Sequence, residues 1–137
     1  MRVALTSESF LPYLSGVTVS VDALARGLGA LGHEVLVVAP RPADRSKLVD
    51  VGSSGPEPAY AWLPSYQLPA IAPAGYRMPW PTPTSEAWDR ARAFRPDIVH
   101  AHSPFVTGLL ATVVAYGRFR LAPQAGMSRR LVLQPAR

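Results

Sequence analysis

The sequence contains no cysteine among its 137 residues. This absence excludes a disulfide framework, a thiolate zinc site and a thiol nucleophile. Long apolar runs are also missing, because the longest weakly polar stretch covers residues 106–116, far below the ~20 residues that cross a bilayer. The apolar start of the chain is soon broken by Thr6, Ser7 and Glu8, so no secretory signal is visible. We therefore predict a soluble, cytoplasmic chain without a membrane span.

Acidic residues are missing from the last part of the chain. All nine lie between Glu8 and Asp97, where nine basic residues balance them, so the formal charge of +5 arises beyond residue 97. The excess consists of five arginines: Arg118, Arg120, Arg129, Arg130 and Arg137. A nucleic-acid surface is favoured when a basic stripe comes with a recognition motif or interleaved aromatic residues. Neither accompanies these arginines, so no nucleic-acid partner is predicted.

The first 40 residues show the order strand, helix, strand. Residues 3–6 form a short apolar run, and residues 33–40 form a longer one that ends at a proline. Between them, apolar residues at spacings of four, three, four and three line one face of a helix over Val17–Leu31. Such a βαβ unit requires parallel strands with a right-handed crossover. The pattern predicts an α/β fold with a parallel sheet and flanking helices.

The later part of the chain supplies one more strand and two more helices. A helix capped by Thr84 or Ser85 is expected to run to about Phe94, where Arg95-Pro96 stops it. Residues 98–101 then form another buried strand, and a further helix is expected from Pro104 to about residue 115. We predict that strands 3–6, 35–39 and 98–101 are neighbours at the centre of the sheet.

Residues 41–83 differ from the rest in composition. Eight of the fifteen prolines lie between Pro56 and Pro83, interleaved with aromatic residues. One interpretation is a loop-rich excursion whose aromatics pack back onto the domain. The other is a lid facing a substrate, since long loops in α/β domains are often functional. The predicted organisation is a domain over residues 1–116 that includes this excursion, followed by a basic, irregular tail over residues 117–137.

Two positions at the expected carboxyl edge of the sheet could serve chemistry. Gly16 precedes the first helix, where free N–H groups attract anions and a missing side chain lets a phosphate approach; a plain turn glycine is the alternative. His100 and His102 would point the same way from their strand, unless the strand ends between them. Either both are buried structural residues, or one positions a ligand by hydrogen bonding. No metal site is predicted, because Asp97 lies at the wrong end of the strand.

Three blocks of the sequence together resemble the amino-terminal domain of retaining GT-B glycosyltransferases, in the large family 4 group. They are RVALTSESFLPYLSGV at residues 2–17, LARGLGALGHEVLVVAP at 24–40, and RPDIVHAHSPF at 95–105. The resemblance implies a Rossmann-like domain, the amino-terminal half of a GT-B fold. It also implies an enzyme that moves a sugar from a nucleotide-diphosphate donor to an acceptor with retention at the anomeric carbon, without a metal or other cofactor.

The resemblance also assigns roles to residues. Gly16 would place its backbone N–H near the donor diphosphate, and His102 would be the catalytic residue that contacts the donor sugar. Glu8, Phe10 and Pro12 would shape the loop before the first helix. The Ser-Gly-Val sequence at residues 15–17 resembles that of members that glycosylate lipids, so a lipid is the candidate acceptor. The predicted membrane contact is at most peripheral, through Leu11, Tyr13 and Leu14 and the aromatic segment Trp62–Trp80, which would place the protein at the inner membrane face.

The resemblance stops after about residue 111. The family's next strand is not recognisable there, and the carboxyl-terminal domain, with its paired glutamates that hold the nucleotide sugar, is absent. We therefore expect a truncated or frame-shifted reading that is inactive by itself. The alternative function is a non-catalytic α/β binding module for a lipid or protein partner. A downstream E-x₇-E pattern would favour the enzyme, whereas the donor, the acceptor and the oligomeric state cannot be predicted from this sequence.

Overall fold

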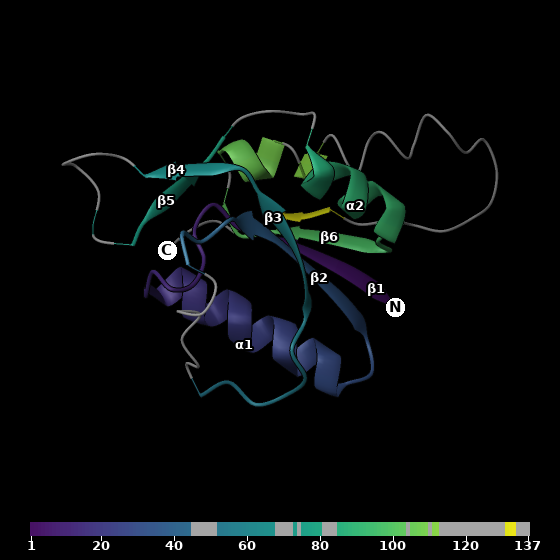
Figure 1. The fold of residues 1–137 in the computed structure, drawn as a ribbon. Coiled ribbons are helices and arrows are strands. Elements are labelled where there is room, and N and C mark those ends of the chain that lie inside the picture. The colour runs from purple at the N-terminus through teal and green to yellow at the C-terminus, as the bar shows by residue number, and fades with distance from the viewer. Residues whose placement is uncertain are drawn as a thin grey trace.

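The computed structural model of the chain describes residues 1–44, 52–67, 73, 75–80, 85–103, 105–109, 111–112 and 131–133. In these residues a parallel five-stranded sheet has the strand order β3-β2-β1-β6-β7, and a separate antiparallel pair is formed by β4 and β5. The elements are β1 (Arg2–Thr6), α1 (Gly16–Ala30), β2 (Glu34–Pro40), β3 (Ala59–Leu63), β4 (Ser65–Gln67), β5 (Arg77–Pro79), α2 (Glu86–Phe94), β6 (Ile98–Ala101) and β7 (Leu131–Leu133). Figure 1 shows α1 on one side of the sheet and α2 on the other.

The three strands predicted at the centre of the sheet are confirmed as neighbours. β1 lies between β2 and β6 and is parallel to both, with Val3 opposite Val35 on one side and Ile98 on the other. The predicted helix between the first two strands is α1, which starts one residue earlier than expected. Ser15 caps it, since its hydroxyl accepts from the Thr18 N–H while its own N–H donates to the Thr18 hydroxyl.

Alternate residues of the central strands face opposite sides of the sheet. Val3 and Leu5 of β1 belong to a core cluster with residues of α1, whereas Ala4 belongs to a second cluster with residues of α2. On β6, Val99 and Ala101 belong to this second cluster. The histidines that alternate with them therefore point to the side of the sheet that α1 covers.

The excursion over residues 41–83 contributes to the sheet, which the sequence analysis does not anticipate. Residues 59–63 form β3, the edge strand beside β2, and β4 follows after a single residue. Prolines bracket this five-residue strand at positions 58 and 64, and they conceal its alternating pattern. Tyr60 stacks on Trp62 with ring centroids 4.7 Å apart, and both pack against a core cluster. Trp80, by contrast, is 55% exposed.

The helix predicted from Pro104 is visible at residues 106–109 and 111–112, and its expected end lies outside the described residues. Of the tail predicted as irregular, only Leu131–Leu133 is described. These three residues form β7, a parallel edge strand beside β6 that the sequence analysis does not foresee. The domain boundary at residue 116 also falls outside the described residues and stays a prediction.

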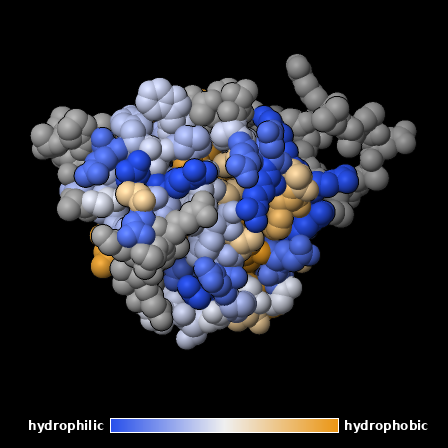
Figure 2. Space-filling view, in the orientation of Figure 1, coloured by the Kyte–Doolittle hydropathy of each residue, from blue (hydrophilic) through white to orange (hydrophobic). Residues whose placement is uncertain are grey.

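Most of the surface on the side seen in Figure 2 is hydrophilic, and the hydrophobic areas on it are small and separate. No helix within the described residues is both long enough and apolar enough to cross a membrane.

Candidate functional site

Gly16 and His102 lie at the carboxyl ends of two neighbouring parallel strands. Gly16 is the first residue of α1, at the end of the loop that follows β1, and His102 comes directly after β6. The backbone N–H of His102 donates to the carbonyl of Thr6, the last residue of β1, over 2.9 Å. Because His102 also points to the side of the sheet that carries α1, the two residues share an edge and a face. We call Gly16, Val17 and His102 the carboxyl-edge site.

The first turn of α1 is open to a ligand. A Cβ added at Gly16 would meet nothing within 4 Å. In the N-terminal turn, the N–H of Thr18 donates to the Ser15 hydroxyl and that of Val19 to the Ser15 carbonyl. The N–H groups of Gly16 and Val17 have no such partner among the described residues. Two free donors at the positive end of a helix dipole are suited to an anion.

His102 is a buried imidazole with an unused nitrogen. The residue is 8% exposed, and its Nε2 has no hydrogen-bond partner within the described part of the chain. Burial, with a smaller contribution from the charge of the neighbouring His100, lowers the pKa of His102 to about 4. The two rings stack with centroids 4.4 Å apart and an angle of 12°, so both point the same way although β6 ends between them, at Ala101. At neutral pH the ring is uncharged, and Nε2 can donate to or accept from a ligand.

Glu8 connects the loop after β1 with the loop after β6. Its Oε2 accepts from the Ser103 hydroxyl over 2.8 Å, and its Oε1 accepts from the backbone N–H of Thr107 over 3.3 Å. The second contact puts a carboxylate at the N-terminus of the helix that follows β6, where the helix dipole stabilises it. The sequence analysis assigns Glu8 to the loop but misses Ser103 and Thr107. Contacts 95 and 99 residues apart in sequence leave no local pattern to detect.

Phe10 and Pro12 occupy the middle of the same loop. Phe10 is 4% exposed, and its ring centroid lies 5.8 Å from that of Tyr60 and 6.1 Å from that of Trp62. The phenyl ring therefore holds the loop against the side chains of β3. Pro12 is half-buried and follows a cis peptide bond. After it, the ring of Tyr13 meets that of Tyr76 edge to face at 5.2 Å, which brings the segment before β5 against this loop.

One of the residues predicted to be exposed to a membrane is buried. Leu11 is 4% exposed and belongs to the core cluster under α1, so the prediction is wrong for this side chain. Leu11 packs with residues of β1, β2 and α1, so its side chain lies between the sheet and the helix. Leu14, at 58% exposed, and the half-buried Tyr13 remain accessible.

Metal binding finds no support in the described side chains. Among them, no group of three or more His, Asp or Glu residues is close enough together to hold a metal ion.

Comparison with known proteins places this fold in a family. The model of Glycosyltransferase Family 4 matches residues 14–122. The chain is 34% identical over 115 residues to the alpha-monoglucosyldiacylglycerol synthase of Acholeplasma laidlawii, covering 84% of this chain and 27% of that enzyme. It is 39% identical over 116 residues to a GDP-mannose-dependent alpha-mannosyltransferase of Corynebacterium glutamicum, covering 84% and 26%. A mannosyltransferase of the same description from Mycolicibacterium smegmatis is 34% identical over 134 residues, covering 98% and 32%.

The chain thus spans between about a quarter and a third of the length of these relatives. Its parallel sheet with helices on both faces is the architecture of the amino-terminal half of a GT-B fold. The family model covers most of the chain, including α1 and β6 with His102. The chain belongs to glycosyltransferase family 4.

Proposed function

We propose that this chain is the amino-terminal domain of a retaining glycosyltransferase that moves a sugar from a nucleotide-diphosphate donor to a lipid acceptor. The observation that carries the proposal is His102, a buried imidazole with an unpartnered Nε2 on the edge and face where α1 begins. The relatives support the substrate classes, because one is named for its dependence on GDP-mannose and another for a glucosyl-diacylglycerol.

The carboxyl-edge site suits the two ends of such a donor. The diphosphate would accept hydrogen bonds from the N–H groups of Gly16 and Val17, at the positive end of the α1 dipole. The Nε2–H of His102 would donate to an oxygen of the donor sugar. As the bond between sugar and diphosphate breaks, positive charge develops on the sugar ring, as in other glycosyl transfers. A neutral histidine can stabilise the sugar oxygens there without repelling that charge, and the low pKa keeps His102 neutral.

We further propose that this chain has no transferase activity by itself. The resemblance to GT-B enzymes implies that a second domain holds most of the nucleotide sugar, and the chain covers only 26–32% of its full-length relatives. Donor binding and sugar transfer are therefore two separate measurements. Weak donor binding is expected from the isolated chain, and sugar transfer is expected only when a second domain is supplied.

A chimera tests the function. Residues 1–112 of this chain would replace the corresponding part of the Corynebacterium glutamicum mannosyltransferase, and transfer from radiolabelled GDP-mannose to extracted lipid would be measured. We expect a folded, active chimera in which His102→Ala lowers kcat by about 100-fold, the loss seen when a positioned donor to developing charge is removed. His33→Ala is the matched control, since this histidine lies at the opposite edge of the sheet, just before β2.

Two outcomes of the chimera experiment would count against the proposal. If His102→Ala keeps kcat within about threefold of the parent chimera, the catalytic role of this residue is wrong. If the chimera folds and binds lipid vesicles but transfers no sugar, the alternative of a non-catalytic binding module gains support. The isolated C-terminal part of the relative, assayed alone, shows whether this chain contributes to transfer at all.

A further inference from the structure

The Glu8 carboxylate joins the two loops that carry the carboxyl-edge site. Glu8 lies in the loop that leads from β1 to Gly16 at the start of α1. Its oxygens accept hydrogen bonds from the Ser103 hydroxyl over 2.8 Å and from the Thr107 N–H over 3.3 Å. We call these two contacts the Glu8 bridge. Because Ser103 directly follows His102, the bridge links the first turn of α1 to the residue beside the imidazole.

Glu8 is not placed to act on a substrate itself. The residue is 9% exposed, and each of its two oxygens accepts from a donor of the protein. Hydrogen bonds to a carboxylate are stronger than those between neutral groups. Removal of the carboxylate would leave two donors without their acceptor, one of them a buried N–H. Any effect of Glu8 on the reaction is therefore indirect, through the residues that it holds.

The loop that carries Glu8 is fixed by contacts on both sides of this residue. Directly before it, the Ser7 N–H donates to the carbonyl of Val38 in β2 over 3.0 Å, and the Ser7 hydroxyl donates to the Ser9 carbonyl over 2.6 Å. Two residues after it, the Phe10 ring packs against the aromatic rings of β3. The carboxylate therefore projects from a pre-formed support.

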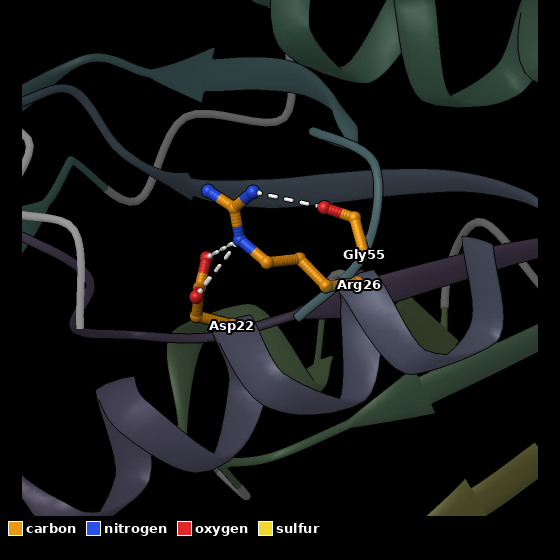
Figure 3. A network of polar contacts seen from close by, with 3 residues as sticks. All are labelled: Asp22, Arg26 and Gly55. Atoms are coloured by element: carbon orange, nitrogen blue, oxygen red, sulfur yellow. Dashed lines mark hydrogen bonds and ion pairs between the residues drawn. The ribbon is translucent and has the colours of Figure 1, made fainter. Parts of the chain in front are cut away.

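The strand that supports Phe10 is itself held by α1. Figure 3 shows that Arg26 of α1 contacts Asp22 through Nε over 3.1 Å and donates to the carbonyl of Gly55 over 3.3 Å. Gly55 lies in the segment that leads into β3, and a Cβ at this position would collide with the Arg26 carbonyl. The helix, β3 and the loop after β1 are thus connected, and the first turn of α1 belongs to this connected part.

The turn after β6 leaves His102 little room to move independently of the bridge. A Cβ added at Gly108 would collide with the Ser103 carbonyl, so the turn packs closely on the helix that follows it. One donor of the bridge, Ser103, lies in this turn, and the other, Thr107, lies in that helix. Closely packed groups transmit a displacement to their neighbours. A shift of the turn therefore also shifts the imidazole that is bonded to it through the backbone.

From these contacts we propose that Glu8 is a positioning residue, which sets the distance between the N–H groups at the start of α1 and the imidazole of His102. This role rests on the proposed function, in which the first group binds the diphosphate and the second binds the donor sugar. A misplacement of about 1 Å near the reacting atoms can lower a rate about 100-fold. The alternative is a bridge that stabilises the fold without setting the position of His102.

A double-mutant cycle in the chimera of residues 1–112 separates the two roles. Glu8→Met keeps the length of the side chain but removes both acceptor oxygens. We expect this variant to lower kcat about tenfold and to keep the KM for GDP-mannose within about threefold of the parent. When His102→Ala is already present, Glu8→Met should cause no further loss, because it acts through that imidazole. An unchanged kcat in Glu8→Met, or losses that multiply in the double variant, would overturn the proposal.

Three further variants complete the design. Glu8→Gln should keep most of kcat, because its amide can accept from the Thr107 N–H and donate to the Ser103 hydroxyl. Ser103→Ala removes one contact of the bridge and leaves the other, so it replaces Glu8→Met in the cycle if that variant does not fold. Glu57→Met is the matched control and should keep the parent's kcat, because this glutamate is exposed and lies just before β3.

Nuclear magnetic resonance of the 137-residue chain measures the position of His102 without any sugar transfer. The ring C–H signals of His102 depend on its stacking with His100 at 4.4 Å, because an aromatic ring shifts the signals of protons above its face. In folded Glu8→Met these signals should move toward those of an unstacked imidazole, and in Glu57→Met they should not. Unchanged ring signals in Glu8→Met would refute the positioning role. Shifted signals together with an inactive parent chimera would support the positioning of His102 and count against the proposed function alone.

Discussion

Acidification should weaken the folded state through His102, by an amount that the structure allows us to work out. In the folded chain, burial and then His100 lower the pKa of His102 from 6.5 to about 4. Between these two values the unfolded chain holds a proton on this residue and the folded chain does not. The unfolded state then binds more protons, so the free energy of unfolding falls as the pH falls through this window.

The expected size follows from the width of the window. One pKa unit corresponds to about 1.4 kcal/mol. Between pH 7 and pH 5 the folded state should lose about 2 kcal/mol through this one residue, and the loss should level off below the folded pKa. That is a large fraction of the stability of a small domain, about 5–15 kcal/mol.

Urea unfolding at pH 7, 6 and 5, followed by tryptophan fluorescence, measures the effect. His102→Gln removes the titrating group, so its unfolding free energy should fall by about 2 kcal/mol less than that of the parent chain over this range. His33→Gln serves as the control and should keep the parent's pH dependence. If the parent chain and His102→Gln lose equal stability between pH 7 and pH 5, or if a pKa above 6 is measured for His102 by NMR, the argument for a neutral buried imidazole is refuted.

Three further predictions follow from other contacts. Gly55→Ala should lower the free energy of unfolding by about 2 kcal/mol or more in urea, because φ is 124° and the added Cβ would collide with the Arg26 backbone. Gly52→Ala, also at positive φ but with no atom near the added Cβ, should cost less, and equal costs for the two variants would contradict the predicted effect of the collision. Glu8→Ala should lower the free energy of unfolding by about 1–3 kcal/mol, because Ser103 and Thr107 lose their hydrogen-bond acceptor, and Glu8→Gln should lower it less. An unchanged urea midpoint in Glu8→Ala would show that these two hydrogen bonds do not stabilise the fold. Flotation with anionic liposomes at low salt should carry part of the protein into the liposome fraction, through the exposed Leu14 and Trp80. The double variant Leu14→Ser, Trp80→Ser should not float, and complete recovery of the parent chain in the soluble fraction would refute the membrane contact.

The sequence predicts the centre of this fold because the centre is built from local signals. The apolar runs of β1, β2 and β6 and the helical spacing in α1 each lie within a short stretch of chain, and parallel pairing follows from their order. β3 is not predicted because its five residues between two prolines show too few alternations of buried and exposed side chains to distinguish a strand from a loop. β7 is not predicted because a segment of three residues is too short to show a periodic pattern, and its position beside β6 depends on contacts with the rest of the sheet.

The candidate site residues also divide into those that a local sequence signal predicts and features that only the fold creates. Gly16 and His102 can be found from the sequence, since each sits at the end of a recognisable strand or at the start of a recognisable helix. What the sequence does not contain is the environment that gives each residue its chemistry. The low pKa of His102 arises from its burial and from the neighbouring His100, and the bridge from Glu8 joins residues 95 positions apart in sequence. Binding chemistry in this chain is therefore set by which element ends the sheet brings together, and substitutions at those ends should change ligand binding more than they change the fold.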